Sequence, residues 1–287
     1  IIASGSYEKP FFVNGWHLPN VLTTGGTQIL VNSQKILPGK KVIICGNGPL
    51  NFQLATELIK NNINVKGIIE TSGKPFSKIL SSLMCLISSP VIFLKGISTY
   101  LKIYFSKVNI HHNSALVKIE DEQDNKKILI KNIKKNNFSS INNIDVVSLN
   151  YGFIPNNDIG KILGLDGFFN KKKSYFQIKK NLFNETSKKN IFFIGEAARN
   201  SGAKISFYEG ELTGFFLKKK KSFFDYISFS VSTFNLLRSN IFQFFLWKIF
   251  SKNISNTEFI TNETLICRCE NVKFNELNKL KDQKNID

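Results

Sequence analysis

The alternation of apolar and polar positions is most regular between residues 41 and 70. An apolar run at Lys41–Cys45 ends in a Gly-Asn-Gly-Pro turn, a helical pattern covers Asn51–Asn62, and a second apolar run, Asn64–Glu70, ends in a carboxylate. A buried strand, a glycine turn, a helix and a second strand are typical of a dinucleotide-binding βαβ unit. The pattern therefore predicts a Rossmann-like region here.

Each position of this turn has a chemical reason. Gly46 allows a tight turn, Gly48 lets the backbone approach a pyrophosphate, and Pro49 opens a helix whose N–H groups point at that phosphate. Glu70 is placed to accept hydrogen bonds from a ribose diol, which favours NAD or another adenine nucleotide over NADP. Asn51 stands where the third glycine of the fingerprint is usual, so a turn that holds no ligand remains an alternative.

Outside this region the pattern predicts further helices and strands of an α/β fold. Strands are expected at 1–5, 108–112, 115–119, 127–130, 145–149 and 191–196, and helices at 27–35, in two pieces packed on the sheet over 79–105, from 203 to about 214, and as a pair over 223–250. His111 and His112 do not predict a metal site, because adjacent strand residues point to opposite faces.

Composition narrows the function classes. The chain has 287 residues and a net charge of +18, but the excess is almost entirely lysine, with arginine only at 199, 238 and 268. Base and phosphate recognition favours arginine, so we expect solvated lysine faces and no nucleic-acid site, with peripheral contact to anionic membranes left open. The uncharged stretch 79–94 contains Pro90 and is short for a membrane span, so no transmembrane segment is expected. Four cysteines and no signal peptide predict a cytoplasmic protein.

Further motifs follow in a recognisable order. Ser4-Gly5 ends the first apolar run, SLNYGFIPNNDIGKILG begins at Ser148, and FFIGEAARNSGAKISFYEGELTG carries Gly195-Glu196 and Gly202-Ala203. With the GNGPL turn, these segments resemble two-dinucleotide flavoproteins. The nearest resemblance is to the FAD-containing subunits of amine and amino-acid dehydrogenases. Examples are the larger-numbered family members found in opine oxidase (its A component), in dye-linked L-proline dehydrogenase (its alpha component) and in hydrogen cyanide synthase.

The resemblance implies roles for these residues. Ser4 and Gly5 would close against FAD, with Ser4 where threonine is usual. Glu196, where the family has aspartate, would accept hydrogen bonds from the ribityl chain of FAD, after Gly195 ends its strand. Gly202 and Ala203 would open a helix whose N-terminus faces the cofactor.

The resemblance also implies a domain organisation. Two Rossmann-like dinucleotide-binding domains are expected, with an NAD-type domain at 36–150 inserted into a discontinuous FAD domain formed by 1–35 and 151–219. An aromatic-rich helical linker at 220–262 and a small C-terminal extension at 263–287 would follow. Because the chain opens at Ile1 inside an apolar run, we expect the first βαβ unit of the FAD domain to precede it.

Cys267 and Cys269 form a Cys-x-Cys pair near the end of the chain. The resemblance implies that they are two of four ligands of a [2Fe-2S] cluster in the truncated start of a small iron–sulfur domain. No further cysteine follows, and Cys45 and Cys85 are expected to be core thiols. Either the rest of that domain lies beyond this chain or the cluster is lost; alone, the pair would be two reduced surface cysteines.

The function that the resemblance implies is that of an FAD-dependent oxidoreductase subunit for CH–NH donors. Electrons from an amino acid, an amine or an opine would pass through FAD and a [2Fe-2S] cluster to an acceptor. The substrate site would lie on a second flavoprotein subunit of a hetero-oligomer, and we can name no catalytic residue here. No dithiol lies beside the flavin motifs, which disfavours a disulfide reductase. The alternative is a non-catalytic nucleotide-binding scaffold.

Overall fold

The computed structural model describes residues 1–123, 125–171, 173–251, 254–255 and 257–284. The chain divides into two compact units. Unit 1 comprises Ile1–Glu8, Ile79–Phe93 and Phe153–Lys248, and unit 2 comprises Lys9–Lys78, Leu94–Gly152 and the chain from Ile249 onward. The predicted domain boundaries remain predictions. In the structure, residues 79–93 group with unit 1, and the C-terminal extension groups with the central part of the chain.

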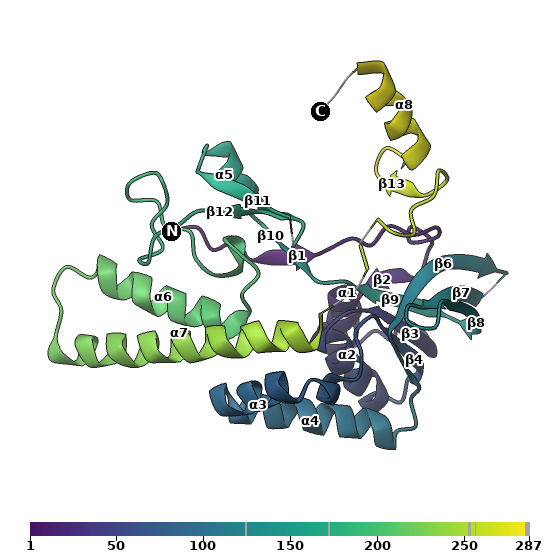
Figure 1. The fold of residues 1–287 in the computed structure, drawn as a ribbon, viewed down its shortest axis with the longest axis horizontal. Coiled ribbons are helices and arrows are strands. Elements are labelled where there is room, and N and C mark those ends of the chain that lie inside the picture. Colours follow the sequence, from purple (N-terminus) through teal and green to yellow (C-terminus); the bar gives the residue numbers. More distant parts are fainter. Residues whose placement is uncertain (124, 172, 252–253, 256, 285–287) are drawn as a thin grey trace. The chain divides into compact units, whose positions relative to one another are not determined.

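Unit 2 is built on a parallel sheet, which among the described residues has five strands in the order β2-β9-β3-β4-β5 (Figure 1). The strands are β2 Val21–Thr23, β3 Lys41–Gly46, β4 Asn64–Glu70, β5 Ile110–His112 and β9 Val146–Asn150. Five of the six residues of β3 are buried, as expected for a parallel strand covered on both faces. The predicted α/β class and the predicted βαβ unit are confirmed.

The helices of unit 2 follow the sequence signals closely at one position and loosely at another. α2 (Pro49–Lys60) starts with Pro49 at its first turn, where a missing N–H costs nothing. The helix expected at 27–35 is instead α1 (Thr24–Gln28), capped by the Thr23 hydroxyl, followed by a π-helical turn at Ile29–Ser33. A short 3-10 turn, Pro75–Ser77, follows β4.

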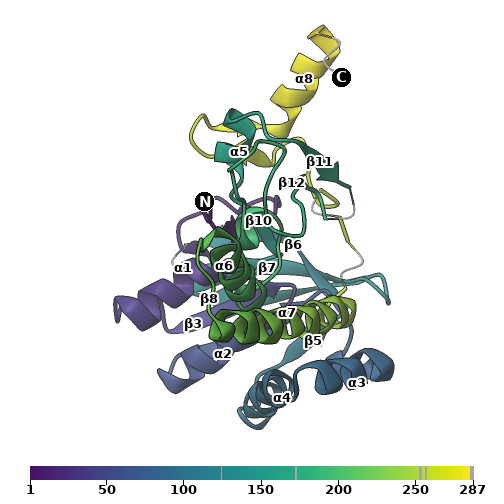
Figure 2. The same ribbon diagram turned by 90° about the vertical axis from the view of Figure 1, so that its left-hand side faces the viewer.

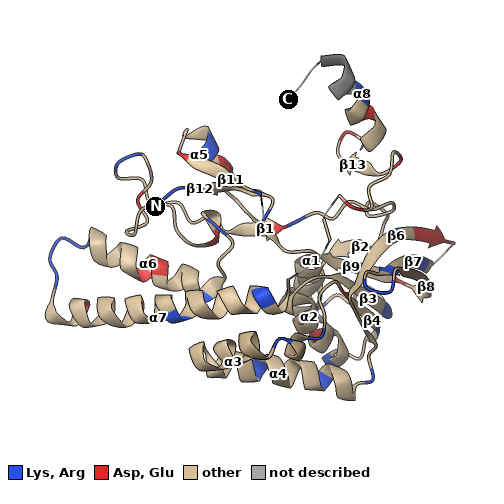
Figure 3. Cartoon of the chain, in the orientation of Figure 1, with Lys and Arg blue, Asp and Glu red and all other residues tan. Residues whose placement is uncertain are grey.

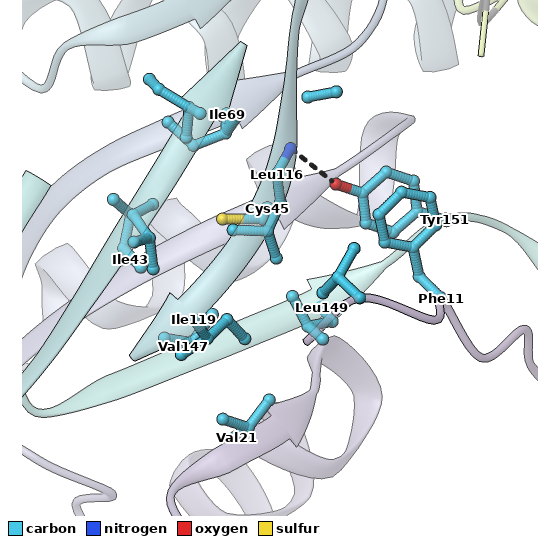
Figure 4. Packing of buried hydrophobic residues seen from close by; sticks show 14 of the residues in the cluster. Phe11, Val21, Ile43, Cys45, Ile69, Leu116, Ile119, Val147, Leu149 and Tyr151 are labelled. Atoms are coloured by element: carbon cyan, nitrogen blue, oxygen red, sulfur yellow. Dashed lines mark hydrogen bonds between the residues drawn. The ribbon is translucent and has the colours of Figure 1, made fainter. Parts of the chain in front are cut away.

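A three-stranded antiparallel meander lies against the parallel sheet. Its strands are β6 Ser114–Glu122, β7 Asn125–Asn132 and β8 Asn137–Ile144. Leu116 and Ile119 of β6 share a core with Ile43 and Cys45 of β3 (Figure 4). Alternate residues of β3 point to opposite faces, so Val42 and Ile44 face the helical side.

The same core is closed by an aromatic pair and by the C-terminal extension. The ring of Phe11 stacks on Tyr151 with centroids 3.6 Å apart, and the Tyr151 hydroxyl accepts a hydrogen bond from the Leu116 amide (Figure 4). The extension forms β13 Leu265–Cys267, β14 Val272–Lys273 and α8 Phe274–Lys284. The Trp16 indole donates to the Leu265 carbonyl, 2.6 Å away, which ties this extension to the start of unit 2.

Unit 1 has short antiparallel strand pairs and long helices. β1 (Ser6–Glu8) pairs with β10 (Phe153–Pro155), and β11 (Gly167–Asn170) pairs with β12 (Tyr175–Ile178). Between them lies α5 (Asp158–Ile162). Phe193 packs with Leu165, Ile178, Ala197 and Ala198 in a small core of its own.

The long helices of unit 1 are α3 (Ile79–Ser88), α6 (Ala203–Leu217) and α7 (Phe223–Ile249); α4 (Pro90–Phe105) begins in unit 1 and continues in unit 2. Figures 1 and 2 show α6 and α7 side by side. Among the described residues, no helix combines the length and the apolar character that a membrane span requires.

Several expected elements need correction. The helix pair expected at 223–250 is wrong, because α7 is one continuous helix. Its interior has no glycine or proline, and the guanidinium of Arg238 lies over the Phe234 ring, so the polar positions do not break it. The strand expected at 191–196 forms only isolated bridges at Phe192 and Phe193, followed by a 3-10 turn at Gly195–Ala197. The strand expected at 1–5 is likewise reduced to a bridge between Ile2 and Phe193.

The two helices expected over 79–105 are confirmed as α3 and α4, but the packing expected of the first is wrong. Instead of covering the sheet, α3 packs on α7: the Cys85 thiol lies 3.8 Å from the Phe242 carbonyl, and Arg238 donates to the Ser88 carbonyl.

Candidate cofactor site

The carboxylate of Glu196 joins two of the segments that the sequence singled out. One oxygen accepts a hydrogen bond from the Ser6 hydroxyl at the start of β1, and the other accepts from the Gly202 amide at the start of α6, both at 3.0 Å. Glu196 lies in the 3-10 turn that Gly195 begins in a left-handed conformation (φ 65°). The structure therefore brings Gly195, Glu196 and Gly202 together with β1.

Ser4 and Gly5 lie on the segment that leads into β1. The Ser4 hydroxyl donates to the Asn156 carbonyl, and the Gly5 carbonyl accepts from the Asn156 amide at 2.9 Å. Gly5 has φ 74°, which disfavours other residues, and nothing lies within 4 Å of the position of an added Cβ. A small, strained turn is thus held open beside the strand that carries Ser6.

The N-terminus of α6 has the features of an anion- or dipole-binding helix end. Gly202 precedes it with φ 88°, Ala203 is its first residue, and no side chain caps it. The Ser201 hydroxyl just before it is 3% exposed and has no hydrogen-bond partner among the described residues. A buried hydroxyl without a partner next to an uncapped helix end fits a polar ligand.

A second carboxylate, Glu209, holds this turn to α6 and was not found from the sequence. Its oxygens accept from the Gly195 amide at 2.7 Å, from Lys180 at 2.7 Å and from Arg199 at 3.4 Å. Its side chain is 4% exposed. Burial lowers the pKa of Lys180 more strongly than Glu209 raises it, so this ion pair is largely removed from water.

The central turn has a different geometry, because its groups are bonded to each other. Glu70 is fully buried and accepts from the Gly48 amide at 3.1 Å, from the Asn47 side chain at 2.9 Å and from the Ser72 amide at 2.9 Å. Burial raises the pKa of Glu70 to about 7, although these donors lower it. The amide expected to meet a pyrophosphate and the carboxylate expected to meet a ribose therefore occupy one another, beside Pro49 at the start of α2.

Packing at Gly46 explains the departure at Asn51. A Cβ at Gly46 would lie 1.8 Å from the Asn150 carbonyl oxygen, so only glycine fits. The Asn51 amide donates to that same carbonyl and accepts from the Thr24 hydroxyl, and the side chain is fully buried. Asn51 thus replaces the small third residue of the fingerprint by tying α2 to β9 and α1.

The two C-terminal cysteines lie apart from other candidate ligands. Cys267 ends β13 and is half-buried, while Cys269 is exposed. In the described part of the chain, no three His, Cys, Asp or Glu side chains are grouped so that they could hold a metal ion.

The comparisons with known proteins agree with the order of the motifs. The chain is 22% identical to the HcnB component of hydrogen cyanide synthase from Pseudomonas aeruginosa, over 99% of this chain and 62% of that protein. It is 25% identical to the A component of opine oxidase from Rhizobium meliloti, over 74% of this chain and 46% of that protein, and 25% identical to its counterpart from Agrobacterium tumefaciens, over 96% and 55%. The chain therefore spans only about half of the length of these relatives. No protein-family model matches it.

The fold was compared in the same way. L-proline dehydrogenase from P. horikoshii superposes with a TM-score of 0.59 at 13% identity, over 98% of this chain and 45% of that one. That similarity shows the fold, a Rossmann-type arrangement around a parallel sheet. Sequence and fold together place the chain in the FAD/NAD(P) oxidoreductase family.

Proposed function

We propose that the chain is the FAD-binding part of an oxidoreductase subunit whose substrate is an amino acid, an amine or an opine. The observation that carries the proposal is the Glu196 carboxylate, fixed between β1 and the uncapped N-terminus of α6. The printed names of the relatives, opine oxidase and hydrogen cyanide synthase, together with the proline dehydrogenase fold, support this substrate class.

The residues that would hold FAD are Ser4, Gly5, Gly195, Glu196, Gly202 and Ala203. They fit a dinucleotide because they supply an open glycine turn, a fixed carboxylate, a helix end and the unpartnered Ser201 hydroxyl. When bound, FAD supplies the two-electron redox chemistry. The chain contributes position and charge: Glu196 can accept hydrogen bonds from a polyol, and the helix end favours electron-rich atoms.

Flavin retention tests the proposal. The purified protein is expected to carry FAD, detected by its absorbance and identified after denaturation. Glu196→Ala should weaken FAD binding about tenfold to hundredfold, because a charge-assisted acceptor is removed. Glu211→Ala is the matched control, since Glu211 lies exposed on α6 and bonds only to Ser232 among the contacts described. A folded, colourless protein that takes up no added FAD would contradict the proposal and favour the non-catalytic scaffold.

The central turn receives no redox role in this proposal. As arranged, Gly48 and Glu70 offer neither a vacant amide nor an accessible carboxylate, so they do not fit NAD without breaking their mutual hydrogen bonds. This observation supports a structural role for Gly46, Gly48, Pro49 and Glu70 beside an active FAD site. NAD or another adenine nucleotide as a ligand would require Glu70 to move.

We further propose that the protein works in a hetero-oligomer whose other member, a second flavoprotein subunit, carries the substrate site. Support comes from the relatives, which are named as subunits. It also explains why no proton-abstracting residue accompanies Glu196. The cytoplasmic location stays a prediction.

Cys267 and Cys269 are proposed as two ligands of a [2Fe-2S] cluster that would relay electrons to or from FAD, and thiol labelling tests this. In iron-free protein these two cysteines should react first. Cys45 and Cys85 are buried, burial raises the pKa of Cys85 to about 11, and both should react only in denaturant. Anaerobic addition of iron and sulfide should then protect Cys267 and Cys269. Unchanged labelling after that treatment would count against the cluster.

A further inference from the structure

α7 exposes a continuous apolar stripe along its length. Six large side chains at helical spacing are between 46% and 75% exposed, namely Phe223, Ile227, Val231, Phe234, Leu237 and Phe244. A helix of this length extends about 40 Å. Soluble proteins rarely leave such a long apolar row uncovered without an interaction partner.

The opposite face of α7 is already used by α6. Phe229 stacks on Phe215 of α6 with centroids 4.5 Å apart, Ser232 donates to Glu211, and Asn240 accepts from Arg199. These contacts fix the rotation of α7 about its axis. The stripe is therefore a fixed surface of unit 1 and not a face that the helix could bury by turning.

Cationic groups accompany the stripe at both ends. Four consecutive exposed lysines, Lys218–Lys221, precede α7, and Lys248 closes it with its ammonium over the rings of Phe244 and Phe245 (Figure 3). The one acidic residue of α7, Asp225, is paired with Lys218 at 2.7 Å. The neighbouring α3 carries no charged residue and also exposes large apolar side chains, including Ile79 and Leu80.

This combination distinguishes between two kinds of occupant. The core of a protein interface is depleted in lysine, whereas a helix lying in a lipid headgroup layer combines a buried apolar face with lysines that reach anionic headgroups. The net charge of +18 acts in the same direction. We propose that α7, through this stripe and Lys218–Lys221, binds the surface of an anionic lipid bilayer.

Vesicle sedimentation tests the proposal on the purified protein. Binding is expected to vesicles of phosphatidylglycerol and phosphatidylcholine, to be weaker on phosphatidylcholine alone, and to fall with salt. Phe234→Glu should reduce partitioning at least tenfold, because a ring leaves the lipid and a charge enters it. The double variant Lys219→Glu/Lys220→Glu should reduce it about tenfold or more.

Ser228→Glu is the matched control, because it adds the same charge at an exposed position of α7 away from the stripe. It should retain most of the binding, and circular dichroism should show all variants folded. Absence of binding to anionic vesicles would overturn the proposal, as would equal losses in Ser228→Glu and Phe234→Glu. A protein that self-associates without lipid, and becomes monomeric in Phe234→Glu, would instead assign the stripe to a protein interface. Flavin content provides a separate readout of the FAD site.

Discussion

Replacing Glu209 by alanine is expected to lower the free energy of unfolding by about 3–5 kcal/mol, because the change leaves buried charges without a partner. Lys180 is 12% exposed and loses its carboxylate, and the Gly195 amide loses its acceptor. Urea unfolding followed by far-UV circular dichroism measures the effect. Because Gly195 precedes Glu196, the variant should also retain less flavin.

Glu211→Ala is the control for this experiment, since it removes the same side chain two positions along α6. Glu211 is exposed and accepts one hydrogen bond, from Ser232. Its loss should cost no more than about 1 kcal/mol. Equal costs for the two variants would show that Lys180 and Arg199 regain water when Glu209 is removed, and that Glu209 does not anchor the turn.

The second large effect is a dependence of stability on pH that comes from Glu70. Burial raises its pKa in the folded protein to about 7, above the ordinary value of 4.5. A raised pKa means that the folded state holds the proton more tightly than the unfolded chain. The stability contribution is therefore complete below the ordinary value and is lost as pH rises through about 7, a change of about 3 kcal/mol.

Comparison with Glu70→Gln isolates this contribution from other titrating groups. Glutamine resembles the protonated acid and does not ionise, so the difference between the two proteins should shift by about 3 kcal/mol in favour of the variant from about pH 5 to about pH 8. Urea unfolding across this range provides the measurement. Parallel curves would show that the donors of Asn47, Gly48 and Ser72 keep Glu70 ionised throughout.

Much of unit 2 could be predicted because its signals are local. The apolar run of β3, the Gly-Pro turn and the carboxylate that ends β4 each reflect a backbone requirement at their own position. β8 was missed because its residues are mostly polar and exposed, so neither alternation nor an apolar run reveals it. Its position is set by pairing with β7, which is a tertiary property.

The candidate site shows the same division. Gly195, Glu196 and Gly202 could be named in advance, since glycines and a carboxylate at an element boundary are visible in sequence. Glu209 could not, because it resembles Glu211, an ordinary exposed glutamate on the same helix. One signal was available: Ile205, Glu209 and Leu212 follow helical spacing and share the buried face of α6. A carboxylate on an apolar stripe indicates a buried partner.

The pairing of β1 also determines when the candidate site is completed during synthesis. β1 at Ser6–Glu8 pairs with Phe153–Pro155, and the Ser6 hydroxyl meets Glu196 still later in the chain. While the ribosome is making residues 9–152, the described contacts of β1 with its strand partner cannot form. Unit 2 can begin to collect its apolar core during that time, whereas the cradle around Glu196 and Gly202 closes only after α6 has emerged. Cofactor loading at this site would therefore be a late event in the life of the new chain.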